Sequence, residues 1–522
     1  MFSLTSLTEN TVSFKEYEEK VLDFSKKVGS TTIKNDLERL DHQIFMLRNK
    51  KIFRNKGLRK LDIKTLLAES EVSRHVYTID QEELDKLQDK DNLMYILARK
   101  RLDDGKKTIY LLDEFVKLRA YGKFSVGVVD LMLKYISKNS YRKTAQIVND
   151  ITGLNISGSA VWNVIQIIGL KLKEKELYED EQYELGFLKC ENREKSILFE
   201  ELDGVYIILQ GKDRRDAVNE YKKYHPDEKI THKTARNKEI KIVSIYEGFK
   251  KESKHRNCLV NKKVFAQIDD QIDIKEKSSK YIDKMYDNSK IKMIIKNSDG
   301  GTWTKEKTNN KTIYQLDMFH VKQAITRGVR EKNDVEFIYQ LIKDKKYDDI
   351  ISYLEKLKYK YDGEVLEVEK LKLLQKYVEK NKRNFVRYQD TKLFKESKEK
   401  GNWYRNLGTQ EATNYQVITS RMKKRRMSFS KIGADNLCRI LAMVISYDYQ
   451  GIEKELNVQT IPLELKEKDA DNIEYQKLLE NRYTSKKKRL KRYKYNEIFK
   501  GSIPGIEYSN SDEMQEIRRI LC

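Results

Sequence analysis

The stretch LFEELDG at residues 198–204 is a largely apolar run that leads to Asp203 and a glycine. The stretch KMIIKNSDGG at residues 292–301 repeats this arrangement around Asp299. Short apolar runs that stop at turn residues are typical of buried β-strands. We therefore expect Asp203 and Asp299 to end two strands that converge in one sheet.

The residues around these runs predict a mixed sheet flanked by helices. Strand candidates are 196–202, 205–210, 241–246 and 258–268, with a charged, exposed stretch at 211–238 between the second and third. Residues 270–288 have the composition of a helix, 292–295 and 312–316 are further strands, and a helix follows Phe319. The order β-β-β-α-β-β-α indicates an α/β fold. An RNase H-like sheet has acids on its first and fourth strands and a third acid on a later helix.

Glu411 is the candidate third acid, because it opens a helix-like run after a charged, helix-forming block at 330–400. Three converging carboxylates can hold two Mg²⁺ ions about 4 Å apart, with Mn²⁺ as a substitute, and such metal pairs cleave phosphodiesters. An acid in a turn is usually only a turn residue, so the order of the three acids carries the prediction. Strand alternation puts Glu201 on the face of Asp203, either as a competing acid or as a support for it.

The segment LDMFH at residues 316–320 adds Asp317 and His320 as accessory candidates, because the two side chains share a face on a first helical turn. A histidine there can contact the scissile strand or hold the loop by hydrogen bonds. The alternative is that both are polar residues at the start of a helix.

The charge balance indicates a polyanionic partner. The chain has 522 residues, of which 105 are basic and 82 acidic, giving a net charge of +23. This surplus favours nucleic acid, although a lysine-rich proteome gives ordinary proteins a similar charge. Four scattered cysteines without a CxxC pair predict neither a zinc ribbon nor a disulfide framework. No signal sequence or long apolar run is present, so we expect a cytoplasmic, nucleoid-associated protein with no membrane partner.

The first 190 residues have the patterns of DNA-binding modules. A long amphipathic helix is expected at 8–48, where it either packs on another chain or on DNA or caps a domain. A small basic β-hairpin unit is expected at 49–80 and another strand at 107–112. Two helices are expected around Gly153, the second capped by Ser157 or Ser159. This is the outline of a helix-turn-helix, although a structural helical hairpin has the same pattern. The expected DNA contacts are Arg142, Lys143, Ser159, Trp162 and Asn163.

Two basic segments follow the third acid. The second could be a solvated helix face, but its interleaved tyrosines favour contacts with nucleic acid. The candidate DNA-backbone contacts in the two segments are Lys423, Lys424, Arg425, Arg426, Lys486, Lys487, Lys488 and Arg489.

Together these motifs resemble the DDE transposases of the ISLre-2 insertion-sequence family, bacterial relatives of the mutator-like elements. The matching segments are YLLD at 110–113, SYR at 140–142, ELDG at 201–204, IYEG at 245–248, SDGGTW at 298–303, LDMFH at 316–320, Glu411 and MSFSKIGAD at 427–435. The resemblance implies that Asp203, Asp299 and Glu411 are the catalytic triad that binds Mg²⁺, and that Asp317 and His320 form a D-x-x-H motif. This chain differs from the family at two motifs. It has SDGG at 298–301 where the family favours GDGA, and FS at 429–430 where the family favours WS. Neither difference removes a carboxylate of the triad.

The expected organisation has seven parts. They are an N-terminal helix suited to oligomerisation (1–48), a basic β-rich unit (49–124), a helix-turn-helix domain (125–190), the first part of an RNase H-like core (191–329), a helical insertion (330–405), core helices with Glu411 (406–455) and a basic tail (456–522). The expected activity is to bind terminal inverted repeats of DNA as a dimer or larger assembly, cleave their 3′ ends and join them to target DNA. The alternatives are an RNase H-fold nuclease that cuts without joining, and a degenerate, non-enzymatic DNA-binding protein.

Overall fold

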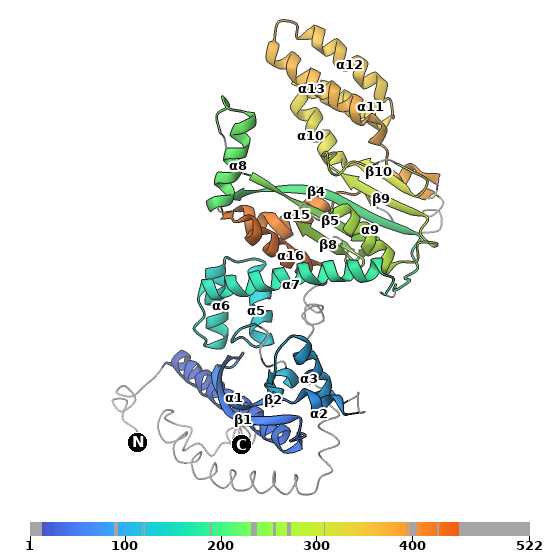
Figure 1. Cartoon of the computed structure of the whole chain (residues 1–522). Helices are drawn as coiled ribbons and strands as arrows, with labels where there is room; N and C mark the ends of the chain where they lie inside the picture. Colours follow the sequence, from blue (N-terminus) through green and yellow to red (C-terminus); the bar gives the residue numbers. More distant parts are fainter. Residues whose placement is uncertain are drawn as a thin grey trace, which may run out of the picture. The chain divides into compact units, whose positions relative to one another are not determined.

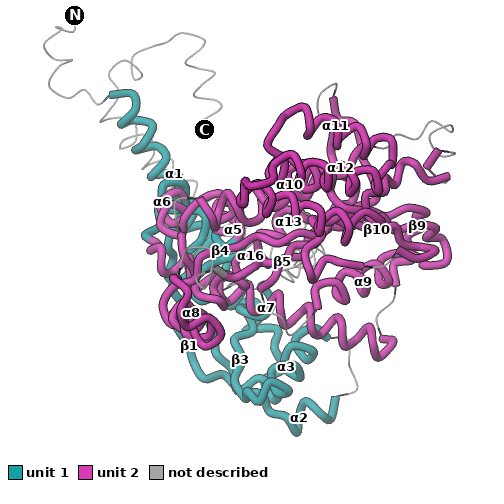
Figure 2. The backbone as a smooth tube through the Cα atoms, turned by 90° about the horizontal axis from the view of Figure 1, so that it is seen from above, with its two compact units in different colours: residues 1–129, 148–155, 457–522 teal, residues 130–147, 156–456 magenta. Residues whose placement is uncertain are grey.

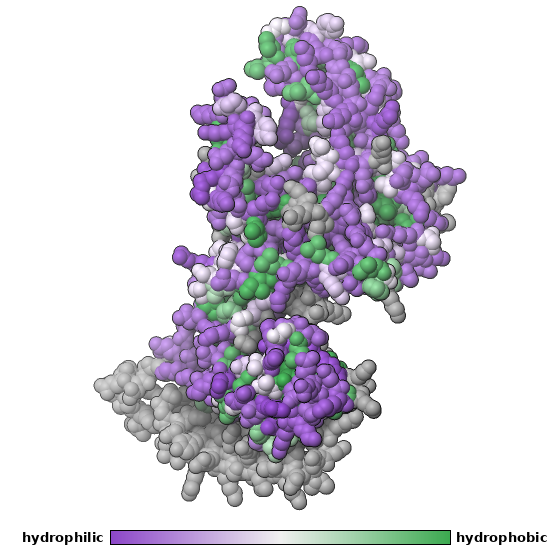
Figure 3. All heavy atoms as spheres, in the orientation of Figure 1, coloured by the Kyte–Doolittle hydropathy of each residue, from purple (hydrophilic) through white to green (hydrophobic). Residues whose placement is uncertain are grey.

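The computed structural model describes residues 13–447, apart from gaps at 88–91, 117, 119–120, 188–189, 231–236, 254–256, 269–272, 307, 393, 396–404 and 425–426 (Figure 1). The described residues form two compact units, one of 13–129 with 148–155 and the other of 130–147 with 156–447 (Figure 2). The expected basic tail lies outside them. Hydrophilic side chains cover most of the face seen in Figure 3. Among the described helices, none is both long and apolar enough to cross a membrane.

The first unit packs a long helix against a three-stranded antiparallel sheet. Its elements are α1 (Phe14–Leu47), β1 (Phe53–Lys64), β2 (Glu69–Ile79), α2 (Gln81–Asp85), α3 (Leu93–Asp103), β3 (Thr108–Ile109) and α4 (Leu111–Val116). The expected hairpin is present as β1 and β2. The strand expected at 107–112 is wrong beyond Ile109, because Leu111 and Leu112 are both buried in a helix, whereas a strand would turn them to opposite faces.

A buried ion pair ties α4 to β2 in this unit. Arg74 is 4% exposed, and its guanidinium donates to the two carboxylate oxygens of Asp113 at 2.5 and 3.0 Å. We expect Asp113→Ala to lower the free energy of unfolding by about 3–5 kcal/mol, because the guanidinium stays buried without its carboxylate. As a control, Asp62→Ala removes the exposed partner of Lys123 and should cost about 1 kcal/mol or less. Urea unfolding measures both losses, and equal values would contradict the burial argument.

Three helices follow, α5 (Val126–Ile136), α6 (Tyr141–Thr152) and α7 (Gly158–Glu184). Gly153 ends α6 with a φ of +75°, and the Ser157 hydroxyl caps α7 by accepting from the Ala160 amide at 3.1 Å. The two expected helices and their turn are therefore present, with Ser157 as the cap. Within the second unit, α7 packs on α16 (Lys431–Tyr447). The approach is close, since a Cβ on Gly169 would lie 2.6 Å from the Cα of Asn436.

The second unit is built on a six-stranded mixed sheet in which the strand order is β10-β9-β4-β5-β8 and β11 pairs with β4. The strands are β4 (Ile197–Leu209), β5 (Asn237–Tyr246), β8 (Lys263–Gln267), β9 (Met293–Ser298), β10 (Thr312–Leu316) and β11 (Ser428–Phe429). β5 is antiparallel to both β4 and β8, whereas β9 runs parallel to β4 and β10. Leu198 and Leu202 pack under α9 (Ile274–Met285), and Phe199 packs on the opposite face with Tyr246 and Tyr388.

Two predictions within this sheet are wrong. The strands expected at 196–202 and 205–210 are one strand, β4, so Asp203 lies inside a strand and not at its end. Gly204 does not interrupt β4 because it accommodates the Glu239 side chain, whose Oε1 would be 1.9 Å from an added Cβ. The strand expected at 258–268 is divided between β7 (Asn257–Leu259), which forms a hairpin with β6 (Phe249–Lys251), and β8. The exposed stretch 211–238 contains α8 (Gly211–Tyr224), which buries no residue.

The block expected to be helical contains α11 (Lys332–Lys343), α12 (Tyr347–Lys360) and α13 (Val365–Asn381). These helices share a core with α10 (Met318–Gly328) and lie near the β9–β10 edge of the sheet (Figure 1). Two 3-10 turns follow, Lys382–Asn384 and Tyr388–Asp390. The chain then forms a short helix, α15 (Gln410–Asn414), which runs directly into a π-helix, η4 (Tyr415–Lys423).

Candidate active site

Three aspartates follow one another across the parallel part of the sheet. The strand register aligns positions 202, 298 and 316 of β4, β9 and β10. Asp203, Asp299 and Asp317 are the next residues along these chain segments, so they lie at one level on neighbouring segments. The first two are the predicted metal ligands, and the third is one of the predicted accessory residues.

Asp203 is held between β4 and α15. Its Oδ1 accepts from the Gly204 amide at 2.7 Å, and its Oδ2 accepts from the side-chain amide of Asn414 at 2.5 Å. Burial raises the pKa of Asp203 to about 6, the charge of Asp299 adds to the rise, and His320 opposes it. The two carboxylates are therefore close enough to repel each other, and a cation between them would relieve that repulsion.

Asp299 is oriented by the loop that follows β9. Its Oδ1 accepts from the Gly301 amide at 2.8 Å and from the Thr304 hydroxyl at 3.3 Å. Gly300 has a φ of +83°, and a Cβ there would lie 2.8 Å from the side chain of Leu316, so this turn requires a glycine. The SDGG motif thus orients the carboxylate through its glycines, and Asp299 directly follows β9, as expected.

Asp317 lies at the start of α10, level with the other two aspartates. It caps α10 by accepting from the Phe319 amide at 2.9 Å, which is the role of a polar residue at a helix start. Burial raises the pKa of its carboxyl, and the negative charge of Glu201 adds to this rise, whereas His320 opposes it. His320 therefore lies within electrostatic reach of both Asp317 and Asp203.

Glu201 is the most completely hydrogen-bonded acid on this face. Its carboxylate is fully buried and accepts from Tyr246 Oη at 2.8 Å, Asn297 Nδ2 at 3.2 Å, the Gly408 amide at 3.1 Å and the Thr409 hydroxyl. With its lone pairs occupied in this way, the Glu201 carboxylate has the hydrogen bonds of a supporting residue. Its bonds to residues 408 and 409 fix the start of α15 on β4.

Glu411 is placed on α15, but the structure does not bring it against the two aspartates. It is exposed, and within the described residues no hydrogen bond or ion pair joins it to Asp203 or Asp299. In the same part of the chain, no three His, Cys, Asp or Glu side chains are close enough together to hold a metal. Asn414, three residues after Glu411, makes the contact to Asp203 instead. Sequence reasoning missed Asn414, although its position one helical turn from Glu411 was a usable signal.

The predicted DNA contacts are surface residues where the structure describes them. Arg142, Lys143, Ser159, Trp162 and Asn163 are all exposed, as are Lys423 and Lys424. Lys424 turns back onto Tyr415, 4.5 Å from its ring centroid. The remaining candidates, Arg425, Arg426, Lys486, Lys487, Lys488 and Arg489, lie outside the described residues.

Two stretches, residues 7–220 and 224–455, match one protein family over most of the chain. The chain belongs to the uncharacterised protein family UPF0236. The matched stretches include the whole sheet and the positions of Asp203, Asp299 and Glu411. No curated protein matches this member of the family.

Proposed function

We propose that this protein is a DNA transposase of the ISLre-2 type, which cleaves the 3′ ends of its element and transfers them to target DNA. The observation that carries the proposal is the adjacency of Asp203 and Asp299 on parallel neighbouring segments, close enough for one charge to raise the pKa of the other acid. An acid whose pKa is shifted by burial and by a neighbouring charge is typical of catalytic centres. The resemblance of the motifs to those of ISLre-2 transposases is the reason for proposing DNA cleavage and strand transfer as the reaction.

The topology of the sheet supports an RNase H-like core. Three antiparallel strands, β4, β5 and β8, come first along the chain, and β9 and β10 then add in parallel on the other side of β4. This order places the first and fourth strands of the series side by side, which that fold requires of its two aspartates. α9 fills the connection before β9, and α11, α12 and α13 precede the third acid, in the position of the expected helical insertion.

The acids fit a divalent cation in ligand type, because Mg²⁺ and Mn²⁺ prefer carboxylate oxygens. Asp203 and Asp299 would hold it, and Glu411, the third ligand that the motif resemblance implies, is exposed on α15 and would have to move towards them. When bound, the metal pair supplies charge neutralisation at the phosphodiester and activates water. The residues of the chain keep the carboxylates in place: Asn414 and Gly204 orient Asp203, and Glu201 fixes α15.

The proposed partner is double-stranded DNA, as terminal inverted repeats and as target. The net charge of +23 and the exposed basic residues at 142–143 and 423–424 support it. We propose that two or more copies assemble on the paired ends, since both ends are cut in concert, and that the protein acts at the nucleoid in the cytoplasm.

A strand-transfer assay with inverted-repeat DNA from the flanks of the gene tests this function. We expect Asp203→Ala, Asp299→Ala and Glu411→Ala each to abolish Mg²⁺-dependent 3′ cleavage and joining while leaving DNA binding in place. Asp227→Asn, an exposed acid of the same unit, is the control. Cleavage without joined products would favour the nuclease alternative. DNA binding with no cleavage by the wild-type protein would favour the degenerate DNA-binding protein.

Metal binding should depend on pH around the raised pKa of Asp203. A cation must displace the proton from this carboxyl, so we expect Mn²⁺ affinity to fall about tenfold per pH unit below about pH 6. Calorimetric titration with Mn²⁺ between pH 5 and pH 8 measures this. Affinity that stays constant from pH 5 to pH 7 would exclude Asp203 as a ligand.

A further inference from the structure

A cavity in the same unit has a lining that does not include the acids. It has a volume of about 420 Å³ and is lined by Tyr141, Trp162, Gln210, Arg421, Phe429 and Ser430, among others. Its walls come from the starts of α6 and α16, the exposed side of α7, β11 and the π-helix. The volume is in the range of about 300–1,000 Å³ that is usual for small-molecule sites.

Arg421 is the unusual residue of this cavity. It is 2% exposed, its Nε donates to the Ile136 carbonyl at 3.0 Å and its Nη1 contacts only the Met427 sulfur, whereas its Nη2 has no hydrogen-bond partner. Within the described ranges, every other buried lysine or arginine has a carboxylate partner. These are Arg74 with Asp113, Lys277 with Glu176, Lys296 with Glu200 and Glu306, and Arg439 with Glu176 and Asp435. Burying an unpaired guanidinium is costly, so an anion is expected to complete the site.

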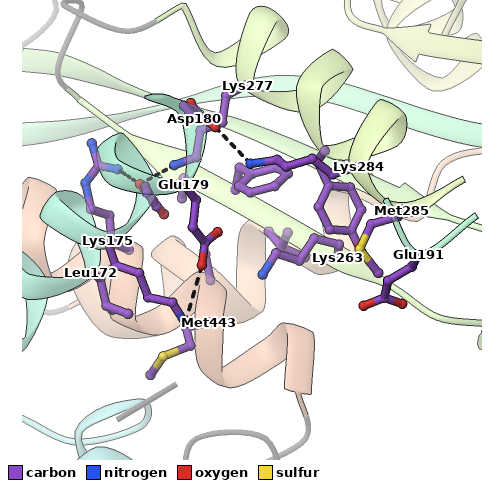
Figure 4. A pocket seen from close by; sticks show the side chains of 17 residues that line it. Leu172, Lys175, Glu179, Asp180, Glu191, Lys263, Lys277, Lys284, Met285 and Met443 are labelled. Carbon is purple, nitrogen blue, oxygen red and sulfur yellow. Dashed lines mark hydrogen bonds and ion pairs between the residues drawn. The ribbon is translucent and has the colours of Figure 1, made fainter. Parts of the chain in front are cut away.

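A neighbouring cavity provides the contrast. About 270 Å³ in volume, it lies among α7, α9, β8 and α16, and its buried basic side chains are paired with carboxylates (Figure 4). Lys277 and Arg439 share Glu176, and Lys284 pairs with Asp180 at 2.9 Å. The buried basic side chains of that cavity have carboxylate partners, whereas Arg421 has none.

The surroundings of Arg421 favour an anion that carries an aromatic ring. α6 begins at Tyr141 with its amino-terminal, positive end at the cavity, and in its first turn the Lys143 amide donates to the Ser140 hydroxyl at 3.2 Å. The amino-terminal end of α16 is also at the wall, but the Lys431 amide there already donates to Asp213 at 2.7 Å. The rings of Tyr141 and Phe429 lie 5.0 and 5.9 Å from the Arg421 guanidinium, and Trp162, 43% exposed, offers an indole at the rim.

We propose that this cavity holds one nucleotide of a DNA strand, with its phosphate on Arg421 and its base against Trp162. The proposal rests on the proposed function, because it takes DNA as the polyanion. Stacking of bases on aromatic side chains and phosphate binding at a helix start with an arginine are the general modes for single-stranded DNA. Arg421 lies on η4, which continues directly from α15, so the same helical stretch carries Glu411, Asn414 and the nucleotide site.

The test is calorimetric titration of the full chain, in EDTA, with 5′-dAMP, deoxyadenosine and inorganic phosphate. We expect 5′-dAMP to bind at least tenfold more tightly than either fragment, Arg421→Gln to abolish binding, and Trp162→Ala to weaken it about 5- to 100-fold. Arg215→Gln, an exposed arginine on α8, should change nothing. The glutamine that replaces Arg421 can still donate to the Ile136 carbonyl and removes a buried unpaired charge, so the variant should unfold at a temperature no lower than that of wild type. If Arg421→Gln does not fold, the loss of 5′-dAMP affinity in the surface variant Trp162→Ala tests the proposal by itself.

Three results would overturn the proposal: no binding of 5′-dAMP, equal binding of phosphate and 5′-dAMP, or binding that both variants retain. The same titration on the Asp203→Ala, Asp299→Ala double variant separates this proposal from the catalytic one. Nucleotide binding should persist there, because the acids are not part of the cavity. A protein that binds nucleotide but never cleaves DNA would therefore refute the transposase function alone.

Discussion

The Asp203→Asn variant is expected to lose cleavage and gain stability at the same time. Loss of a metal ligand should reduce Mg²⁺-dependent cleavage about 10³-fold or more, since several kcal/mol of charge stabilisation at the phosphodiester are removed. Yet in the metal-free protein the ionised Asp203 is unfavourable, because burial and the charge of Asp299 raise its pKa to about 6. Asparagine keeps the size of the side chain without the charge.

The gain in stability should have a definite pH dependence. The folded-state pKa of Asp203 lies above the ordinary aspartate value of 3.8, so the folded protein loses stability as the pH rises from about 4 through 6. The uncharged asparagine side chain of the variant causes no such loss. We therefore expect the variant to be more stable than wild type by about 1–3 kcal/mol above pH 7 and by almost nothing at pH 4.

Thermal unfolding in EDTA at pH 4 and pH 8 measures this difference, with Asp227→Asn as the matched exposed control. Added Mn²⁺ should reverse the order at pH 8, because it stabilises only the protein with the complete carboxylate pair. A variant that is less stable than wild type at pH 8 without metal would show that Asp203 is a structural residue. The cleavage assay alone could not separate these two roles.

The two aspartates could be predicted from sequence because their signals are local. The signal is an apolar run that leads to Asp-Gly, and it spans no more than ten residues. Both runs form strands of the same sheet. The error at Asp203, expected at a strand end but found inside β4, has an equally local origin. Gly204 looks like a stop, and only the neighbouring strand reveals that it accommodates Glu239.

The supports of the site could not be predicted, because they depend on contacts between distant segments. Asn414 reaches Asp203 across 211 positions, and the Gly408 amide reaches Glu201 across 207. The burial of Arg421 could not be predicted either. Because Arg421 is close to the run KKRR at 423–426, the sequence suggests one more exposed basic residue. Its burial follows from packing on α5 and β11, which no spacing in the sequence encodes.

Replacing Glu201 should have the largest effect on stability within the second unit. Glu201→Ala leaves two buried donors, on Tyr246 and Asn297, and two partly buried hydrogen bonds, from Gly408 and Thr409, without their acceptor. We expect the free energy of unfolding to fall by about 3–5 kcal/mol. The start of α15 should also detach from β4, so Asn414 would no longer orient Asp203 and cleavage would fall with it.

Variants at Lys262 can show whether Glu201 stabilises the protein through its charge or through its hydrogen bonds. Burial lowers the pKa of Lys262 to about 8, and the charge of Glu201 opposes this fall, while its Nζ donates to the Thr413 hydroxyl at 2.8 Å. Glu201→Gln keeps the shape of the side chain but removes the charge that favours protonated Lys262. Its destabilisation, measured by urea unfolding, should therefore shrink as the pH rises from 7 to 9, because Lys262 is then neutral in both proteins.

Adding Lys262→Met to Glu201→Gln should recover part of the lost stability at pH 7, since no partly buried charge is then left without its partner. The double variant should remain poor at cleavage, because its weakened hydrogen bonds to residues 408 and 409 still misplace α15. Full recovery of both stability and cleavage would mean that Glu201 acts only through its charge. If neither stability nor cleavage recovers, the hydrogen bonds of Glu201 alone hold α15. Lys262 then has no part in positioning Glu411.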